Sequence, residues 1–188
     1  MASVTPSTEI SDVVFVTPEV FGDDRGYFVE TYRRQWFPNG REMVQANRGN
    51  RAKGCLVGLH YHLHQADYWY VPFGHARVVL HDLRDDGPTG GATEVIDIGE
   101  LDGGPNNHVG IYIPPGVAHG FASLSDMTIT YLVDSYYNPA DELGLLWNDP
   151  AVGADWGVES PVMSDRDQLN PGRSSIDPQF RPHFALRT

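Results

Sequence analysis

Cysteine is almost absent from this sequence. Cys55 is the single cysteine among 188 residues, so no disulfide can form within the chain, and such usage is typical of a reducing compartment. Long hydrophobic runs are also missing, because no apolar stretch approaches the about 18 residues that cross a bilayer. The first residues lack the basic and apolar regions of a secretory signal. We therefore expect a cytoplasmic protein with no membrane partner.

Positive charge is scarce as well. The chain has 13 basic and 25 acidic residues, a net charge of −12, which disfavours nucleic acid and anionic membranes as partners. Lys53 is the single lysine, so Schiff-base chemistry has one candidate and is set aside. An anionic ligand would need a local cationic site, and the basic turn that contains Arg48, Arg51 and Lys53 is the candidate for contacts to a diphosphate.

Helical periodicity is sparse, and short segments rich in β-branched and aromatic residues recur instead, separated by Gly, Pro, Asn and Asp clusters. The segments expected to be strands are 13–17, 26–32, 42–47, 55–62, 67–72, 76–83, 93–98, 109–113, 119–124 and 128–137. Short helical turns are expected at 31–37 and 139–147. This pattern predicts an all-β fold, a double-stranded β-helix or jelly-roll barrel of the cupin kind with short helices near the C-terminus.

The chain reads as a single domain over residues 1–188, with a core at about 10–170. Its last residues, from Asn170 onward, are rich in Pro, Arg and Ser. We expect 171–188 to be a loosely ordered tail, or alternatively an arm that lies over a partner subunit.

Strand alternation gathers polar side chains on inward faces, because residues i and i+2 share a face. It groups Leu56, Gly58, His60 and His62; Asp67, Trp69 and Val71; His119, Phe121 and Ser123; and Ile129, Tyr131 and Val133. Histidines and a carboxylate that converge in a barrel mouth predict a functional site.

Two chemistries fit this cluster. His60, His62, Asp67 and His119 offer three imidazoles and a carboxylate, a set that binds a transition metal. Alternatively, a histidine base held by a carboxylate works with a tyrosine acid on the opposite wall, without metal. A third interpretation is that the His-x-His pair is only a polar strand surface. The residues alone leave all three open. His64 is expected to be exposed, and His75 and His81 to lie at the surface or core edge.

Several segments together resemble one known family. They are FGDDRGYFVETY, VQANRGNRAKGCLVGLHYH, IPPGVAHGFASLSD, YLVDSYYNPADELGLLWNDPAVGADW and MSDRDQ, and in order and spacing they are similar to the dTDP-4-dehydrorhamnose 3,5-epimerase family over about residues 10–170. The resemblance implies a cupin-type jelly roll, a homodimer that exchanges N-terminal strands, and a nucleotide-diphosphate sugar substrate. It implies an isomerase of deoxysugar, rhamnose-like biosynthesis that epimerises C3 and/or C5 of a dTDP-4-keto-6-deoxyhexose without a cofactor.

The resemblance also implies roles for individual residues. His60 matches the catalytic base, Asp167 the carboxylate that pairs with it, and Tyr131 the proton donor on the opposite face. The positions that match the family's substrate-binding residues are Phe21, Arg25, Glu30, Gln45, Asn47, His119 and Tyr137.

The chain departs from the family pattern at three positions. Val57 stands where the family has an arginine, His62 where it has a glutamine, and Asp67 where it has a pocket lysine expected to stabilise the enolate. These changes rebuild another pattern, because Gly54, His60, His62, Asp67 and Gly74 resemble the first metal-binding motif of cupins, with Asp in place of Glu. Residues 114–119 resemble the core of the second motif.

The interpretation favoured is therefore a metal-free epimerase. Two rivals stay open: a metal-dependent cupin enzyme that uses His60, His62, Asp67 and His119 to hold one transition-metal ion, and an inactive homologue that binds a nucleotide sugar.

Overall fold

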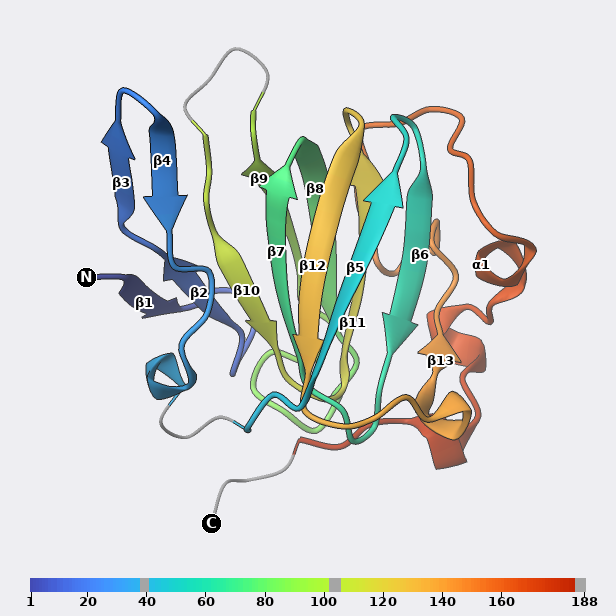
Figure 1. Cartoon of the computed structure of the whole chain (residues 1–188). Coiled ribbons are helices and arrows are strands. Elements are labelled where there is room, and N and C mark those ends of the chain that lie inside the picture. Colours follow the sequence, from blue (N-terminus) through green and yellow to red (C-terminus); the bar gives the residue numbers. More distant parts are fainter. Residues whose placement is uncertain (38–40, 102–105, 185–188) are drawn as a thin grey trace.

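The computed structural model describes residues 1–37, 41–101 and 106–184, and its core is a barrel of two antiparallel sheets (Figure 1). In the first sheet the strands follow the order β1 (Ser3–Pro6), β2 (Val14–Thr17), β10 (Gly110–Ile113), β7 (Asp67–Phe73), β12 (Met127–Val133) and β5 (Gln45–Arg51). In the second the order is β13 (Leu143–Gly144), β6 (Leu56–Tyr61), β11 (Val117–Ser123), β8 (His75–Asp82) and β9 (Thr93–Gly99).

A separate hairpin of β3 (Val20–Asp23) and β4 (Gly26–Val29) stands apart from the barrel, and the short helix α1 (Asp165–Leu169) lies at the opposite side (Figure 1). The helical turns expected at 31–37 and 139–147 are single 3₁₀ turns at Arg34–Trp36 and Pro139–Asp141. No helix in the described ranges is long and apolar enough to cross a membrane.

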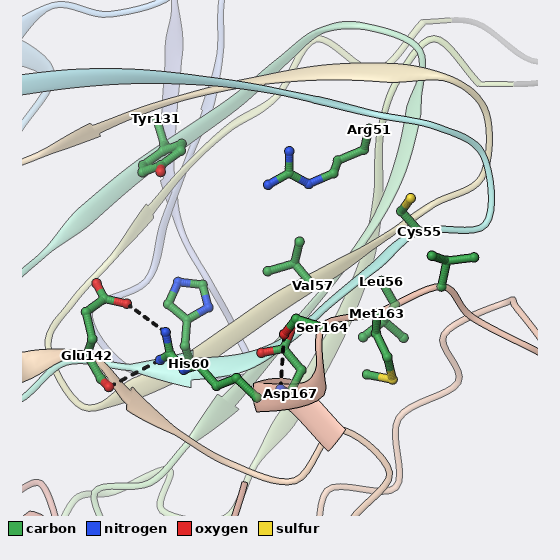
Figure 2. A pocket seen from close by; sticks show the side chains of 12 residues that line it. Arg51, Cys55, Leu56, Val57, His60, Tyr131, Glu142, Met163, Ser164 and Asp167 are labelled. Carbon is green, nitrogen blue, oxygen red and sulfur yellow. Dashed lines mark hydrogen bonds and ion pairs between the residues drawn. The ribbon is translucent and has the colours of Figure 1, made fainter. Parts of the chain in front are cut away.

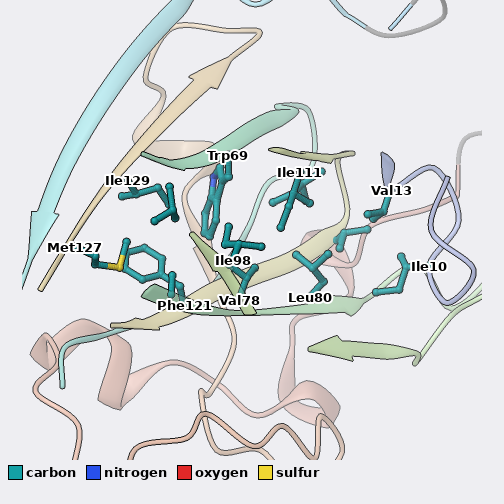
Figure 3. Close-up of a cluster of buried hydrophobic side chains, with 14 residues drawn as sticks. Ile10, Val13, Trp69, Val78, Leu80, Ile98, Ile111, Phe121, Met127 and Ile129 are labelled. Carbon is teal, nitrogen blue, oxygen red and sulfur yellow. The ribbon is translucent and has the colours of Figure 1, made fainter. Parts of the chain in front are cut away.

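The space between the two sheets holds the main hydrophobic core (Figure 3). Apolar side chains of β7, β10 and β12 pack there against those of β8, β9 and β11; they include Trp69, Ile111, Ile129, Val78, Leu80, Ile98 and Phe121. Val79, between Val78 and Leu80, points the other way into a second cluster with Leu59, Tyr61, Leu145 and Trp156. Both faces of the second sheet are therefore buried, which explains why the consecutive residues Val78, Val79 and Leu80 of β8 are all apolar.

The C-terminal segment covers the outer face of the second sheet. Ile176 is buried in the second cluster, the Tyr61 hydroxyl donates to the Phe180 carbonyl at 3.0 Å, and Arg173 Nε donates to His81 Nε2 at 3.0 Å. The expectation of a loosely ordered tail is thus wrong for residues 171–184, which pack on their own barrel. Residues 185–188 lie outside the described residues.

A β-bulge interrupts β6 beside the polar cluster. His119 pairs with His60 and Phe121 pairs with Val57, so β6 advances three residues where β11 advances two. The predicted grouping of Leu56 with His60 is therefore wrong: Leu56 points into the outer cluster, and Val57 takes the inward position.

Candidate active site

The site lies between the sheets, where the second sheet supplies imidazoles and the first supplies their partners. His60 on β6 and His119 on β11 are a registered pair of neighbouring strands. On the facing sheet, Tyr131 of β12 registers with Trp69 of β7. The alternation that predicted these inward faces is confirmed for Trp69, Phe121, Ile129 and Tyr131, which all contact the core between the sheets.

His60, His62, Asp67 and His119 form one compact group. Each can offer a ligand atom such that all four atoms lie within 4.8 Å of one another. The side chains of His62, Asp67 and His119 are buried, at 3%, 1% and 2% exposure, whereas His60 is only partly buried. The predicted convergence of three imidazoles and a carboxylate is therefore confirmed.

Backbone carbonyls fix the protons of these rings. His62 Nδ1 donates to the Asp141 carbonyl at 2.7 Å, and His119 Nδ1 donates to the Val117 carbonyl at 2.8 Å. His60 Nδ1 lies 3.5 Å from the Gly58 carbonyl, so its ring is held more loosely. Because a carbonyl only accepts, the neutral form of each ring carries its proton on Nδ1 and has its lone pair on Nε2. The Nε2 of His119 is buried without a hydrogen-bond partner.

Asp67 is held from two sides. Its carboxylate accepts from Trp69 Nε1 at 3.0 Å and from Gln65 Nε2 at 2.9 Å, and its oxygens lie 3.7 Å from His119 Nε2 and 3.9 Å from His62 Nε2. Burial works to raise the pKa of Asp67, but the nearby imidazoles outweigh it and hold the pKa well below its ordinary value. Asp67 is consequently ionised at neutral pH.

A cavity of about 470 Å³ opens beside His60 (Figure 2). Its lining includes His60, Tyr131, Asp167, Arg51, Glu142 and Arg166, and its size suits a small-molecule ligand. Burial, reinforced by the charges of Asp67 and Glu142, raises the pKa of Tyr131. Tyr131 therefore keeps its proton at neutral pH and can donate it.

His60 and Asp167 border the same cavity, and each contacts the backbone of Gly58. Asp167 accepts from the Gly58 N–H at 3.3 Å, while His60 Nδ1 faces the Gly58 carbonyl. Within the described residues no hydrogen bond joins His60 to Asp167 directly. Burial lowers the pKa of His60 well below its ordinary value, and the neighbouring His119 and His62 lower it further. His60 is thus neutral at physiological pH.

The residues expected to bind substrate are divided among several places. Gln45 Nε2 donates to Asn47 Oδ1 at 2.9 Å, and Asn47 lines a second cavity of about 340 Å³ that shares Tyr131 with the first. Phe21 and Glu30 line a third cavity of about 270 Å³ beside the N-terminus. Arg25 pairs with Asp23 on the exposed hairpin.

The remaining residues predicted from the sequence do not line the large cavity. The side chain of Tyr137 is 67% exposed. His64 is exposed as expected. His75 and His81 are both buried, so a surface position is wrong for them, and His81 serves structure by hydrogen bonds to Thr93 and Arg173.

Several residues of the site were not identified from the sequence. Asp141 accepts the His62 proton through its carbonyl, and its carboxylate accepts the backbone N–H groups of Leu63, His64 and Gln65. Glu142 and Arg166 line the cavity and pair with each other at 3.6 Å. The one available signal is Asn138, whose side chain caps the 3₁₀ turn that carries Asp141.

Comparison with known proteins decides the family. The family model described as dTDP-4-dehydrorhamnose 3,5-epimerase matches residues 7–174. The chain belongs to the dTDP-4-dehydrorhamnose 3,5-epimerase family. An enzyme of that name from Shigella flexneri is 36% identical over 181 residues, which covers 92% of this chain and 96% of the relative. One from Neisseria gonorrhoeae is 38% identical over 167 residues, 85% of this chain, and the chain spans about half of that relative's length, 49%.

Solved structures of sugar epimerases are also similar to this chain. The dTDP-6-deoxy-D-glucose-3,5-epimerase of Legionella pneumophila, in complex with dTDP-4-keto-L-rhamnose, superposes with a TM-score of 0.88 at 27% identity, covering 99% of this chain and 100% of the other. NovW of Streptomyces spheroides, a 4-keto-6-deoxy sugar epimerase, gives 0.87 at 28% identity, covering 98% and 94%. The predictions of a cupin-like jelly roll and of a dTDP-sugar epimerase of deoxysugar biosynthesis are confirmed.

Proposed function

We propose that the chain epimerises C3, C5 or both of a dTDP-4-keto-6-deoxyhexose with His60 as base and Tyr131 as acid. The hydrogens at C3 and C5 are acidic because the electron pair left behind delocalises into the 4-keto group as an enolate. Breaking one C–H bond transfers its proton to the base, and a new proton added from the opposite face inverts the carbon. This chemistry needs no oxidant, so the proposal includes no redox cofactor.

One observation carries the proposal: His60 and Tyr131 border the same cavity from opposite sheets (Figure 2). His60 is neutral, and its Nδ1 proton faces the Gly58 carbonyl, so Nε2 is the atom that accepts the substrate's proton. Tyr131 holds its phenolic proton and delivers it from the other wall. The His60 imidazolium then releases its proton to solvent water and the tyrosinate takes one up, which restores both groups. Asp167, on the same side of the cavity as Gly58, is proposed to orient His60 and stabilise its imidazolium.

Polar groups around the reacting centre support a nucleotide-sugar substrate. Arg51 lines the cavity and has no carboxylate partner within the described part of the chain, so its guanidinium is available to a diphosphate. Gln45 and Asn47 lie on the adjacent strand β5, where Asn47 registers with Tyr131. A substrate that is a nucleotide-activated sugar supports the proposal that the protein acts in the cytoplasm.

A homodimer that shares N-terminal strands is part of the proposal. The β3–β4 hairpin pairs with neither barrel sheet, and its aromatic side chains Phe21, Tyr27 and Phe28 are 53%, 49% and 63% exposed. Such a patch favours burial against another copy. Phe21, Arg25 and Glu30 would then meet substrate in the partner's site rather than in their own. Light scattering should give a dimer for the wild type and a monomer for Phe28→Asp, and a monomeric wild type would contradict this arrangement.

Solvent exchange tests the reaction. In heavy water with a dTDP-4-keto-6-deoxyhexose, we expect mass spectrometry and NMR to show deuterium at C3, C5 or both. His60→Asn should abolish exchange, and Tyr131→Phe should keep part of it while inversion at C5 is lost.

The matched controls are His64→Ala and Tyr136→Phe, whose side chains are exposed and do not line the cavity. Both should exchange at the wild-type rate. Wild-type protein that binds the sugar nucleotide but incorporates no deuterium would favour a binding protein that has lost the reaction.

A further inference from the structure

We propose that His62, Asp67 and His119 bind a divalent transition-metal ion in the buried group beside His60, next to the cavity. The inference deepens the proposed function, since it assigns to this site a positive charge that proton abstraction requires. It is carried by the geometry of the three side chains, by the direction of their lone pairs and by one buried nitrogen without a partner.

The donor atoms are close enough to share one ion. Asp67 lies between the two histidines, with carboxylate oxygens 3.9 Å from His62 Nε2 and 3.7 Å from His119 Nε2. Imidazole nitrogens and carboxylate oxygens bind such ions at about 2.0–2.2 Å, so two ligands of one ion can be separated by up to about 4 Å. The observed separations fall within that limit.

The lone pairs of the three donor groups face the same small space, which the amide nitrogen of Gln65 also reaches. Carbonyls of Asp141 and Val117 hold the Nδ1 protons of His62 and His119, so both Nε2 atoms and the carboxylate present electron pairs to the same small space. A carbonyl that fixes the far nitrogen is the usual outer support of a metal-bound histidine. The Nε2 of His119, on a side chain only 2% exposed, has no partner. Buried polar atoms in this condition call for an explanation, and a cation supplies one.

Gln65 occupies part of this space in the ion-free arrangement. Its amide nitrogen donates to Asp67 at 2.9 Å and lies 3.3 Å from His62 Nε2. The Gln65 side chain is only partly buried, and its oxygen accepts from Ser135 Oγ at 3.2 Å. Rotation of this side chain would break these contacts and clear the space for an ion, while Trp69 continues to hold Asp67 through its indole N–H.

His60 stays outside the ligand set. Its Nδ1 lies 3.5 Å from a backbone carbonyl oxygen, whereas the Nδ1 atoms of His62 and His119 lie 2.7 and 2.8 Å from theirs. His60 also borders the cavity, and the other two histidines do not. Three protein ligands leave coordination positions open, and His60 remains free to carry a proton. Two neutral imidazoles, one carboxylate and a dication sum to a single positive charge, a suitable stabiliser for an enolate oxygen. Lys53, the one lysine, lies on an exposed turn and cannot supply that charge.

Metal analysis tests the inference directly. Full-length protein, purified without added metal and then dialysed against Co²⁺, should hold about one equivalent per chain and show visible absorption from cobalt bound by nitrogen and oxygen. Asp67→Asn and His62→Gln should each weaken Co²⁺ binding at least tenfold. His64→Ala and His75→Asn, a surface and a buried histidine outside the group, should bind like the wild type, and circular dichroism confirms that each variant is folded.

The His60→Asn variant separates the two proposals. It should keep the cobalt equivalent and its spectrum while losing deuterium exchange. Loss of the ion in this variant would overturn the three-ligand assignment. Another outcome is a folded wild type that holds less than a tenth of an equivalent of Co²⁺ and still exchanges deuterium in the presence of a chelator. This result would overturn the metal site and support the epimerase reaction without it. Bound Co²⁺ without any exchange would support the site and contradict the reaction.

Discussion

The imidazoles of His60 and His119 meet edge to face across two paired strands, with ring centroids 4.3 Å apart and planes inclined at 65°. A proton on one ring would repel charge on the other, in a site that already disfavours charge through burial. The arrangement therefore keeps His60 neutral, which is the form that removes a proton from carbon.

The pH dependence of exchange should reflect this arrangement. Because burial and the neighbouring histidines lower the pKa of His60 well below the ordinary 6.5, the acid limb of kcat/KM should lie below pH 6.5. Stability should also fall as the pH falls. Below pH 6.5 His60 is protonated in the unfolded chain but not in the folded chain, so the free energy of unfolding decreases. His81, whose pKa burial and Arg173 lower to about 4, adds to this loss.

Both parts of that prediction can be measured separately. The rate of deuterium exchange, measured over pH 5–8, gives the acid limb of kcat/KM. An acid limb at or above pH 6.5 would contradict a neutral His60. Urea unfolding of chelator-treated protein gives stability, and His81→Asn should reduce the acid-induced loss without moving the limb of the exchange profile.

Arg51 should contribute to substrate affinity more than to turnover. It lines the cavity beside His60 and Tyr131, and replacing it by glutamine removes a charge-assisted contact to the diphosphate. We expect Arg51→Gln to raise KM about tenfold or more with a smaller change in kcat. Lys53→Gln is the matched control, since Lys53 is exposed and does not line that cavity. Equal effects of the two substitutions would point to general surface charge instead.

Asp141 should be needed to hold the loop after β6. Its carboxylate accepts the N–H groups of Leu63, His64 and Gln65 at 2.7, 3.1 and 3.2 Å. Asparagine can replace only part of this set, so Asp141→Asn should lower the free energy of unfolding by about 1–3 kcal/mol and weaken Co²⁺ binding. Urea denaturation and cobalt titration measure the two effects. Asp155→Asn, at an 85% exposed side chain, should change neither.

A methyl group at position 58 would test the contribution of Asp167. A Cβ built on Gly58 comes within 2.9 Å of Asp167 Cβ and 3.2 Å of its Cγ, so Gly58→Ala should displace that side chain from the cavity. We expect kcat to fall while KM changes little, because the imidazolium loses its partner. Asp167→Asn should show the same loss, and the two changes combined should cost no more than either alone. Additive losses would mean that Asp167 acts independently of Gly58.

Strand alternation predicted much of the site because each inward residue depends only on its own strand. Asp67, Trp69 and Tyr131 follow the period of two, and His60 and His62 do so beyond the bulge. Leu56 did not, because the extra residue in β6 is set by pairing with β11, which the local sequence does not reveal. Short helices near the C-terminus were predicted, but the range of the five-residue helix α1 was not, because it is too short for a periodic pattern.

The remaining residues depend on contacts between distant segments. Asp141 gains its role only when its turn packs beside Leu63 and His64, and nothing in the sequence around it marks that contact. Phe21 and Arg25 lie on a hairpin that pairs with neither sheet, so whether they reach a pocket is a property of two chains rather than one. The family resemblance identified Phe21 and Arg25 as candidate site residues, and strand alternation could not identify them.

The late position of Asp141 and Asp167 in the chain has a consequence for biosynthesis. The partner of His62 is the Asp141 carbonyl, 79 residues later in the chain, and the partner of the Gly58 N–H is the Asp167 carboxylate, 109 residues later. On the ribosome, most barrel strands can therefore pair before His62 is fixed in place. A nascent chain that ends before Asp141 has no partner for His62, and one that ends before Asp167 lacks the carboxylate beside Gly58. Maturation of the site is thus one of the last events of synthesis, after most of the barrel strands can already pair.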